Sequence, residues 1–268
     1  MNEFARAVGS EFRKVFSTRL WWVLALILFG YVGIAAAGIG FLLSAIPEEG
    51  AGMPDGFLAP LVYGMTTATG YVFPIIFGAM SVTGEVRHRT LGTVFLATPH
   101  HSVVLAAKAV SGAVVGALLG VVGLLASVGL GAAVLAANGQ QTLLDDGDTW
   151  LLIGRIVLAM ALWGLVGVGV GVMIPSQIGS IVAVLAFTQF VEPLLRLAAG
   201  FAEWTGEVGR FLPGAAGDAL VGASFFTIMS TGTGAAQLEW WQGGLVLGAY
   251  AVVFGAIGSL TTWRRDIT

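Results

Sequence analysis

Long apolar runs separated by short polar segments make up most of the chain. A helix needs about 20 apolar residues to cross the hydrocarbon core of a membrane, and most of these runs are that long or longer. Helices also satisfy their own backbone groups in lipid. We therefore predict an all-α integral membrane protein, one domain over 1–268 with six membrane spans. The predicted spans are 20–46, 57–82, 102–137, 150–173, 181–195 and 243–263.

The segment before the first span has the pattern of an amphipathic helix, because its apolar residues recur at steps of three and four. The apolar face contains Phe4, Val8, Phe12, Val15 and Phe16, and the polar face contains Arg6, Ser10, Arg13, Lys14 and Ser17. We predict that residues 1–19 lie in the inner headgroup layer and contact lipid. An ordinary solvated helix is the alternative. A cleavable signal peptide is not favoured, because its apolar segment would be shorter.

Segments rich in acids and helix breakers predict the loops between spans. Residues 47–56 contain two prolines, three glycines and three acids, and 138–149 contain three aspartates. Both are predicted external loops. The aspartates do not have the spacing of a calcium-binding loop, so a solvated loop is favoured over a cation site. Residues 174–179 predict a minimal internal turn.

Proline, glycine and lysine predict local features inside the spans. Pro60 and Pro74 are expected to kink or interrupt the second span. A stripe of glycines on the third span, at four-residue steps, predicts close packing against another helix rather than a chemical site. The stripe comprises Gly112, Gly116 and Gly120. Lys108 lies early in the third span, and its amine is expected to extend back to the membrane surface.

The region after the fifth span mixes charged residues with short apolar stretches. Residues 198–241 contain a breaker at Pro213 and Gly214, which predicts one or two short external, re-entrant helices before the sixth span. Glu192 and Arg196 lie four residues apart near the outer end of the fifth span, so on a helix they can pair. Two hypotheses remain for this pair: it lines a transport path, or it is a structural clasp.

Composition supports a membrane protein and excludes thiol chemistry. Hydrophobic residues make up 57% of the chain and charged residues 10%. Soluble domains carry about 25% charged residues, so this chain has too few charges to cover a surface in water. It has no cysteine, which excludes disulfides and iron–sulfur clusters.

The distribution of charge predicts the orientation. With six spans and both termini in the cytoplasm, nine of the twelve basic residues lie on the inner side. These are Arg6, Arg13, Lys14, Arg19, Arg87, Arg89, Lys108, Arg264 and Arg265. An excess of basic residues in inner loops is what sets topology. We therefore predict a multi-pass protein of the cell (plasma) inner membrane.

Motifs for catalysis are missing from the sequence. Neither Lys14 nor Lys108 follows a glycine, as a phosphate-binding loop requires. There is no His-Glu-x-x-His helix and no Gly-x-Ser-x-Gly elbow. His100 and His101 are adjacent and would point in different directions on a helix, so interfacial polar residues are favoured over a metal site. We expect no enzymatic activity, no metal and no nucleic-acid partner.

One charged segment, TGEVRHRTLGTVFLATPHH at 83–101, lies between two apolar runs. It contains all three histidines, and Arg87 and Arg89 flank His88 near a single acid, Glu85. A core of a soluble domain would not isolate such a segment, whereas a cytoplasmic loop between two membrane helices would. We interpret it as the point where a partner binds.

This segment resembles the loop after the second span in permease subunits of ABC-2 type exporters. There, a pattern close to G-E-x-R-x-x-T is followed by a leucine and a proline, as in Gly84–Thr90 and Leu96–Pro99 here. The N-terminal helix, the six spans and the Leu212–Gly214 segment are also similar to that family. The resemblance implies a cytoplasmic coupling helix in a groove of a separate ATPase subunit, which binds ATP and Mg. It places the ATPase contact at Glu85, Arg87, His88, Arg89 and Thr90.

The resemblance also implies an assembly of two permeases, identical or sibling, with two ATPases. The few charges in the spans favour a hydrophobic or amphipathic substrate such as a drug, lipid or peptide. Two other function classes remain open. An ion-coupled carrier would need acids at the bilayer midplane, where Glu192 is the one candidate. A membrane scaffold would use 83–101 to hold a soluble partner.

Overall fold

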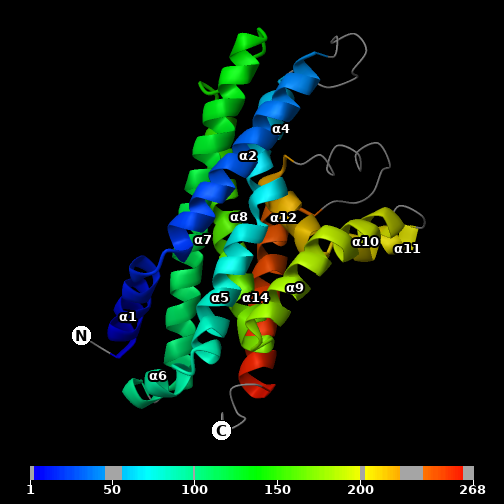
Figure 1. The fold of residues 1–268 in the computed structure, drawn as a ribbon. Coiled ribbons are helices and arrows are strands. Elements are labelled where there is room, and N and C mark those ends of the chain that lie inside the picture. Colours follow the sequence, from blue (N-terminus) through cyan, green and yellow to red (C-terminus); the bar gives the residue numbers. More distant parts are fainter. Residues whose placement is uncertain (1–2, 46–55, 99, 200–202, 224–237, 262–268) are drawn as a thin grey trace.

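The computed structural model describes residues 3–45, 56–98, 100–199, 203–223 and 238–261, and within these ranges every regular element is helical (Figure 1). The longer helices are α1 (Glu3–Ser17), α2 (Leu20–Ser44), α4 (Leu58–Gly70), α5 (Val72–Arg87), α7 (His101–Ala137), α8 (Gly147–Met173) and α14 (Trp240–Thr261). The shorter ones are α6 (Leu91–Ala97), α9 (Gln177–Ala186), a π-helical turn (Phe187–Val191), α10 (Glu192–Ala199), α11 (Glu203–Gly209) and α12 (Pro213–Val221).

Within the part of the chain that the structure describes, six helical segments are long and apolar enough to cross a membrane, which confirms the predicted six-helix fold. They are α2, the pair α4–α5, α7, α8, the fifth span Gln177–Ala199, and α14. The first, third, fourth and sixth agree with the predicted limits to within three residues. The start of α1 and the end of α14 lie at the same end of the bundle as α6, as an even number of crossings requires (Figure 1).

Helix α8 forms the centre of the bundle. It packs against α5, α7 and α14. In the most apolar 18-residue stretch of each span, 67% of the residues are buried in α8, but only 17% in α14 and 22% in the fifth span. The outer spans therefore present most of their apolar surface to lipid or to another protein.

Glycines allow α7 to approach α8 closely, which confirms the packing predicted for the glycine stripe. A β-carbon at Gly116 would collide with the carbonyl oxygen of Met160. One at Gly120 would lie 3.0 Å from Cβ of Met160, and one at Gly112 would lie 3.1 Å from the carbonyl oxygen of Gly164. A larger residue at these positions would therefore push α8 or its side chains away, and glycine permits the close approach.

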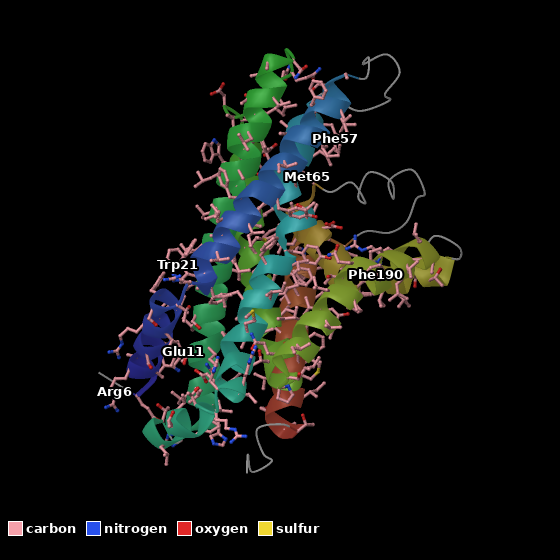
Figure 2. All side chains as sticks on the ribbon, in the orientation of Figure 1. Arg6, Glu11, Trp21, Phe57, Met65 and Phe190 are labelled. Carbon is pink, nitrogen blue, oxygen red and sulfur yellow. The ribbon has the colours of Figure 1, made fainter. Side chains whose placement is uncertain are left out.

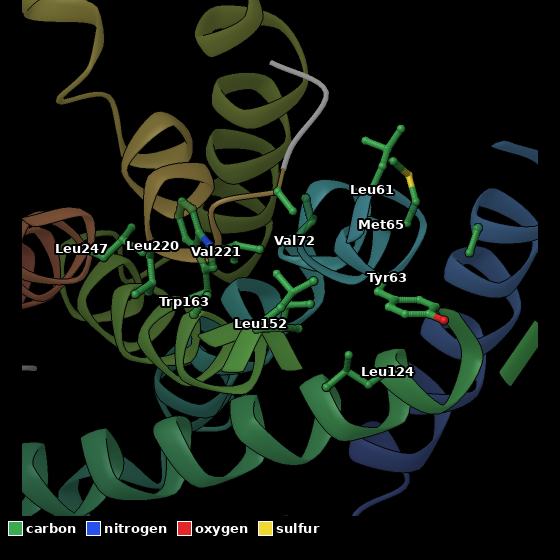
Figure 3. Packing of buried hydrophobic residues seen from close by; sticks show 14 of the residues in the cluster. Leu61, Tyr63, Met65, Val72, Leu124, Leu152, Trp163, Leu220, Val221 and Leu247 are labelled. Atoms are coloured by element: carbon green, nitrogen blue, oxygen red, sulfur yellow. The ribbon is translucent and has the colours of Figure 1, made fainter. Parts of the chain in front are cut away.

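The main core cluster joins α4, α8, α12 and α14 (Figure 3). Trp163 of α8 packs near Leu220 of α12, and Leu247 of α14 completes this side of the cluster (Figure 3). On the other side, the buried Tyr63 of α4 donates a hydrogen bond to the carbonyl oxygen of Thr142, at 2.6 Å. The short helix α12 is therefore packed inside the bundle.

The second span is interrupted at Tyr71, between α4 and α5. Pro74 has no N–H group and cannot bond to the carbonyl of Gly70, four residues before it. The predicted interruption is thus confirmed at Pro74. At Pro60 the prediction is wrong, because this proline lies in the first turn of α4, where its missing N–H needs no partner.

Much of the charged segment 83–101, predicted as a loop, is helical. Helix α5 continues through Arg87, and α6 and the start of α7 occupy most of the rest. The chain turns between α5 and α6 at Arg89, whose φ is 54°. The loop prediction is wrong for 83–87 because Glu85 is paired inside the bundle, so its charge does not end the helix.

The fifth span is longer than the predicted 181–195, since it covers Gln177–Ala199. The charges of Glu192 and Arg196 do not end it, because they pair within the bundle. The π-helical turn joins α9 to α10, and α10 and α11 then lead away from the bundle (Figure 1). Two short helices, α11 and α12, lie in 198–241 as predicted, but α12 is packed inside the bundle, so the prediction of an external position is wrong for this helix. Residues 200–202 and 224–237 of this segment lie outside the described residues.

Candidate functional site

Lys108 is completely buried at the end of the bundle that carries α1 and α6, with 0% of its side chain exposed. Its ammonium nitrogen lies 3.0 Å from Glu11 Oε2 of α1 and 2.9 Å from Glu85 Oε1 of α5. It also donates to the carbonyl oxygen of Ser81, at 3.1 Å. The prediction that its amine reaches the membrane surface is therefore wrong, because two carboxylates hold it inside the protein.

Lys14 closes the arrangement into a ring. Its Nζ lies 2.6 Å from Glu11 Oε1 and 2.7 Å from Glu85 Oε1. We call Glu11, Lys14, Glu85 and Lys108 the lysine–glutamate cluster, in which two positive charges balance two negative ones. Burial lowers the pKa of Lys14, but its hydrogen bonds to Glu11 and Glu85 raise it by more, so the net pKa lies above the usual value. Lys14 is therefore protonated at neutral pH, and its contribution to stability is lost only as the pH rises through that raised pKa.

Two members of this cluster, Glu11 and Lys108, were not among the predicted site residues. The sequence does contain a pattern that could have identified Glu11 as a site residue. Glu11 lies on the same face of α1 as Phe4, Val8 and Val15, so it is an acid on an otherwise apolar face. An acid in an apolar stripe needs a buried cation, and the lone lysine near the start of α7 supplies it. Figure 2 shows Glu11 on the side of α1 nearest α7.

The cluster ties α1 to α5 and α7. Buried ion pairs contribute little net stability, but removing one partner strands a buried charge. Within the described residues, Oε2 of Glu85 is buried without a hydrogen-bond partner. The ion pairs of Glu85 with Lys14 and Lys108 hold the end of α5, and the turn that follows it, in place relative to α1 and α7.

A mostly polar surface lies beside the cluster, formed by exposed side chains at the end of α5 and on α6. We call it the α5–α6 surface; it comprises Arg87, His88, Arg89, Thr90, Gly92, Thr93 and Leu96. Arg87 donates to Gln177 Oε1 at 3.0 Å, which links this surface to the start of α9. Of the predicted coupling residues, only Glu85 lies outside the surface, because it faces the cluster.

Helix α6 is anchored on one side and exposed on the other. Leu91 is buried, and Val94 and Phe95 pack against a small cluster that includes Val104 of α7. Leu96 projects outward with 86% of the residue exposed. An exposed leucine among basic and polar side chains is a composition that suits a protein contact.

The apolar face predicted for α1 divides into two parts. Val15 is buried against the bundle, whereas Phe4 and Phe16 are exposed. Phe16 stacks on Phe12 at 6.3 Å and meets Trp21 edge-on at 5.4 Å. Val8 is half-buried and Arg13 is exposed. The exposed phenylalanines agree with the predicted lipid contact, which stays a prediction.

The predicted pair in the fifth span forms and gains a third member. Arg196 donates to Glu192 Oε1 through Nε at 3.2 Å and Nη2 at 3.1 Å, and to Asp218 Oδ2 of α12 through Nη1 at 2.6 Å. The backbone N–H of Gly214 also donates to Glu192 Oε1, at 2.6 Å. We call Glu192, Arg196 and Asp218 the arginine–carboxylate cluster. It fastens α12 to the fifth span, and it lines a cavity with Tyr71, the break in the second span.

Asp218 was not a predicted site residue, although it is the one acid in the short apolar helix α12. The pair was expected near the outer end of the bundle. It faces the middle of the second span instead, because α12 folds inward and brings Asp218 to that level.

Comparisons with known proteins do not assign a family or a function to the chain. The function is therefore inferred from the lysine–glutamate cluster, the α5–α6 surface and the arginine–carboxylate cluster. No protein-family model matches the chain, and the search of curated proteins finds no match.

Proposed function

We propose that the chain is the membrane-spanning permease subunit of an ATP-driven ABC exporter. A separate ATPase subunit binds ATP and Mg and docks on the α5–α6 surface. The permease lies in the cell inner membrane with both termini in the cytoplasm. It moves a hydrophobic or amphipathic substrate out of the cell by alternating between inward-open and outward-open packings.

The observation that carries this proposal is the attachment of the α5–α6 surface to the bundle. The lysine–glutamate cluster joins α1, α5 and α7 immediately beside the surface. A displacement imposed on α6 therefore moves the second and third spans together with α1. A transporter that is driven by a separate subunit requires such a mechanical connection between its docking surface and its membrane spans.

The chemistry of the surface indicates its partner. Arg87 and Arg89 make it basic, and Leu96 adds an exposed apolar contact. A groove with acidic walls and an apolar floor complements this combination. We assign that groove to the ATPase subunit, in keeping with the resemblance of residues 84–99 to ABC-2 permeases.

A second permease copy or a homologue completes the proposed assembly. The fifth span exposes large apolar side chains, including Phe190 at 70% and Leu194 at 65% (Figure 2). Lipid or a second copy covers such a face in a membrane. The dimer, homomeric or heteromeric, is part of the proposal.

One observation favours a second candidate function, an ion-coupled carrier that works without an ATPase. Glu192 is only 2% exposed and lies midway along the bundle, where carriers place ion-relaying acids. Transport by the purified chain alone in vesicles, driven by an ion gradient, would support this function over the exporter.

The orientation can be tested by cysteine labelling, because the natural chain has no cysteine. We expect a single cysteine at His88 to resist a membrane-impermeant maleimide in intact cells and to react after permeabilisation. A matched cysteine at Gln141, which is exposed in the loop between α7 and α8, should react in intact cells. Labelling of the His88→Cys protein in intact cells would reject the topology and the ATPase contact with it.

The partner can be tested by purification. We expect an ATPase encoded beside this chain to co-purify with it and to become cross-linked to a photoreactive group on the single cysteine of the His88→Cys protein. The same group at Gln141→Cys is the control and should give no cross-link. Equal cross-linking at both positions, or transport without any ATPase, would overturn the proposed function.

A further inference from the structure

A partly open cavity of about 220 Å³ lies beside Glu192 and is lined by residues of several spans and of α12. Tyr31 lines it from near the middle of α2, Tyr71 from the break in the second span, and Trp163 from α8. Thr188 and Gln189 line it from the π-helical turn. The cavity therefore lies about halfway along the bundle, the depth at which membrane transporters commonly bind their ligands.

Glu192 lines this cavity and has one carboxylate oxygen without a hydrogen-bond partner among the described residues. The Arg196 guanidinium and the N–H of Gly214 both donate to its Oε1. Oε2 is buried and has no hydrogen-bond partner among the described residues. A buried carboxylate oxygen without a partner is costly, and native proteins rarely leave one. The oxygen thus indicates a group that the protein alone does not provide.

The charge around the cavity favours a cation. Two carboxylates, Glu192 and Asp218, share the guanidinium of Arg196. The neighbouring sequence segments 200–203 and 224–237 contain no lysine or arginine that could add a second positive charge. The lysine–glutamate cluster, by contrast, holds equal numbers of acids and bases. An excess negative charge in a buried cavity is stabilised by binding a positive ligand.

The aromatic wall favours an organic cation over a metal ion. The rings of Tyr71 and Trp163 lie with their centroids 4.8 Å apart beside Glu192. Ring faces attract ammonium groups, and Trp is the strongest in this respect. Metal ions are usually held by several acidic, histidine or cysteine side chains, and among the described residues no three of these come together at one point.

We propose that the cavity binds the ammonium group of an organic cation, with the Glu192 carboxylate as its counter-charge and the rings of Tyr71 and Trp163 beside its alkyl groups. The ligand comes either from water, as a free amine or quaternary ammonium compound, or from the headgroup of an aminolipid. Identifying it as the exported substrate rests on the proposed function, whereas binding itself does not.

Isothermal titration of the purified full chain with choline tests the proposal. The detergent is dodecyl maltoside, which carries no nitrogen. The comparison ligand is 3,3-dimethylbutan-1-ol, in which carbon replaces the charged nitrogen of choline. We expect choline to bind at least about tenfold more tightly than the neutral alcohol. Equal affinities, or no choline binding, would overturn the proposal without requiring any variant.

Two variants distinguish choline binding in the cavity from nonspecific attraction of choline to acidic side chains. Glu192→Gln keeps an oxygen for Gly214 and Arg196 but removes the charge, so choline affinity should fall by about tenfold or more. Glu207→Gln removes an exposed acid of α11 and should leave affinity unchanged. If Glu192→Gln does not fold, Trp163→Phe, which keeps a smaller ring, should weaken choline more than the alcohol. Equal loss for both ligands would contradict cation recognition.

Lipid discs distinguish the two sources of the ligand. If an aminolipid occupies the cavity, choline should bind in discs of phosphatidylglycerol and be displaced in discs of phosphatidylethanolamine. If the ligand is a free cation, both discs should give the same affinity. The assay contains no ATPase, so choline binding would support this site whatever the purification test for an ATPase partner shows. Failure of that purification test would reject the proposed exporter and leave this site standing.

Discussion

Lys108→Met is expected to destabilise the protein by about 3–5 kcal/mol, since it leaves Glu11 and Glu85 buried with a single, half-exposed cation. Methionine retains the unbranched apolar part of the lysine side chain and removes the ammonium group, so the loss mainly measures charge rather than packing. The measurement is the free energy of unfolding of the purified chain in dodecyl maltoside. Because α1 is held to α5 and α7 through this lysine, proteolysis within α1 should accelerate as well.

Lys14→Met is the matched control, because Lys14 pairs with the same two carboxylates but its side chain is 40% exposed. Water can replace an exposed ammonium group, so the expected loss is below about 1 kcal/mol. Adding Glu85→Gln to Lys108→Met should recover part of the stability, because it removes one stranded charge. Equal losses for the two lysines would show that burial at Lys108 does not control the cluster.

Arg87→Glu is expected to reduce export by roughly tenfold or more while ATP hydrolysis and membrane insertion persist. The substitution places a negative charge against the proposed acidic groove, and it removes the bond to Gln177. Side chains elsewhere on the α5–α6 surface remain, so the ATPase can still bind weakly. Export and ATP hydrolysis should be measured together in vesicles that contain both subunits.

Arg19→Glu provides the control for this experiment. Arg19 is exposed at the junction of α1 and α2, so its reversal changes the charge of the predicted cytoplasmic side equally without altering the α5–α6 surface. Normal export by Arg87→Glu would reject the coupling role. Glu85 is less suitable for this test, because reversing its charge would place a third cation in the lysine–glutamate cluster and disturb stability.

The sequence predicts the six helices well because each exceeds the length at which an apolar run must cross a membrane. It predicts the ends of the helices less well where a charge is neutralised by a distant residue. Glu85 and Glu192 both looked like helix ends, yet Lys108 and Arg196 pair with them and the helices continue. Such pairing depends on which helices are neighbours, and hydropathy alone does not give that information.

The candidate sites were predictable only in part. The exposed residues Arg87–Thr90 could be found as a charged segment between spans, and Glu192 with Arg196 as an i, i+4 pair. Glu11 and Asp218 were harder to find, because each becomes significant only when α1 or α12 folds against the bundle. A single acid on an otherwise apolar helical stripe is the pattern that would have identified both.

The length of α7 has a mechanical consequence. Its 37 residues form a rod of about 55 Å, whereas the hydrocarbon core of a bilayer is about 30 Å thick. Lys108 holds α7 near its first residues through ion pairs with Glu11 and Glu85, so the helix can act as a lever arm. A tilt of about 10° at Lys108 would move the far end of α7, about 44 Å away, through roughly 8 Å. Angstrom-scale work at one face of the membrane would thereby become a nanometre-scale stroke at the other.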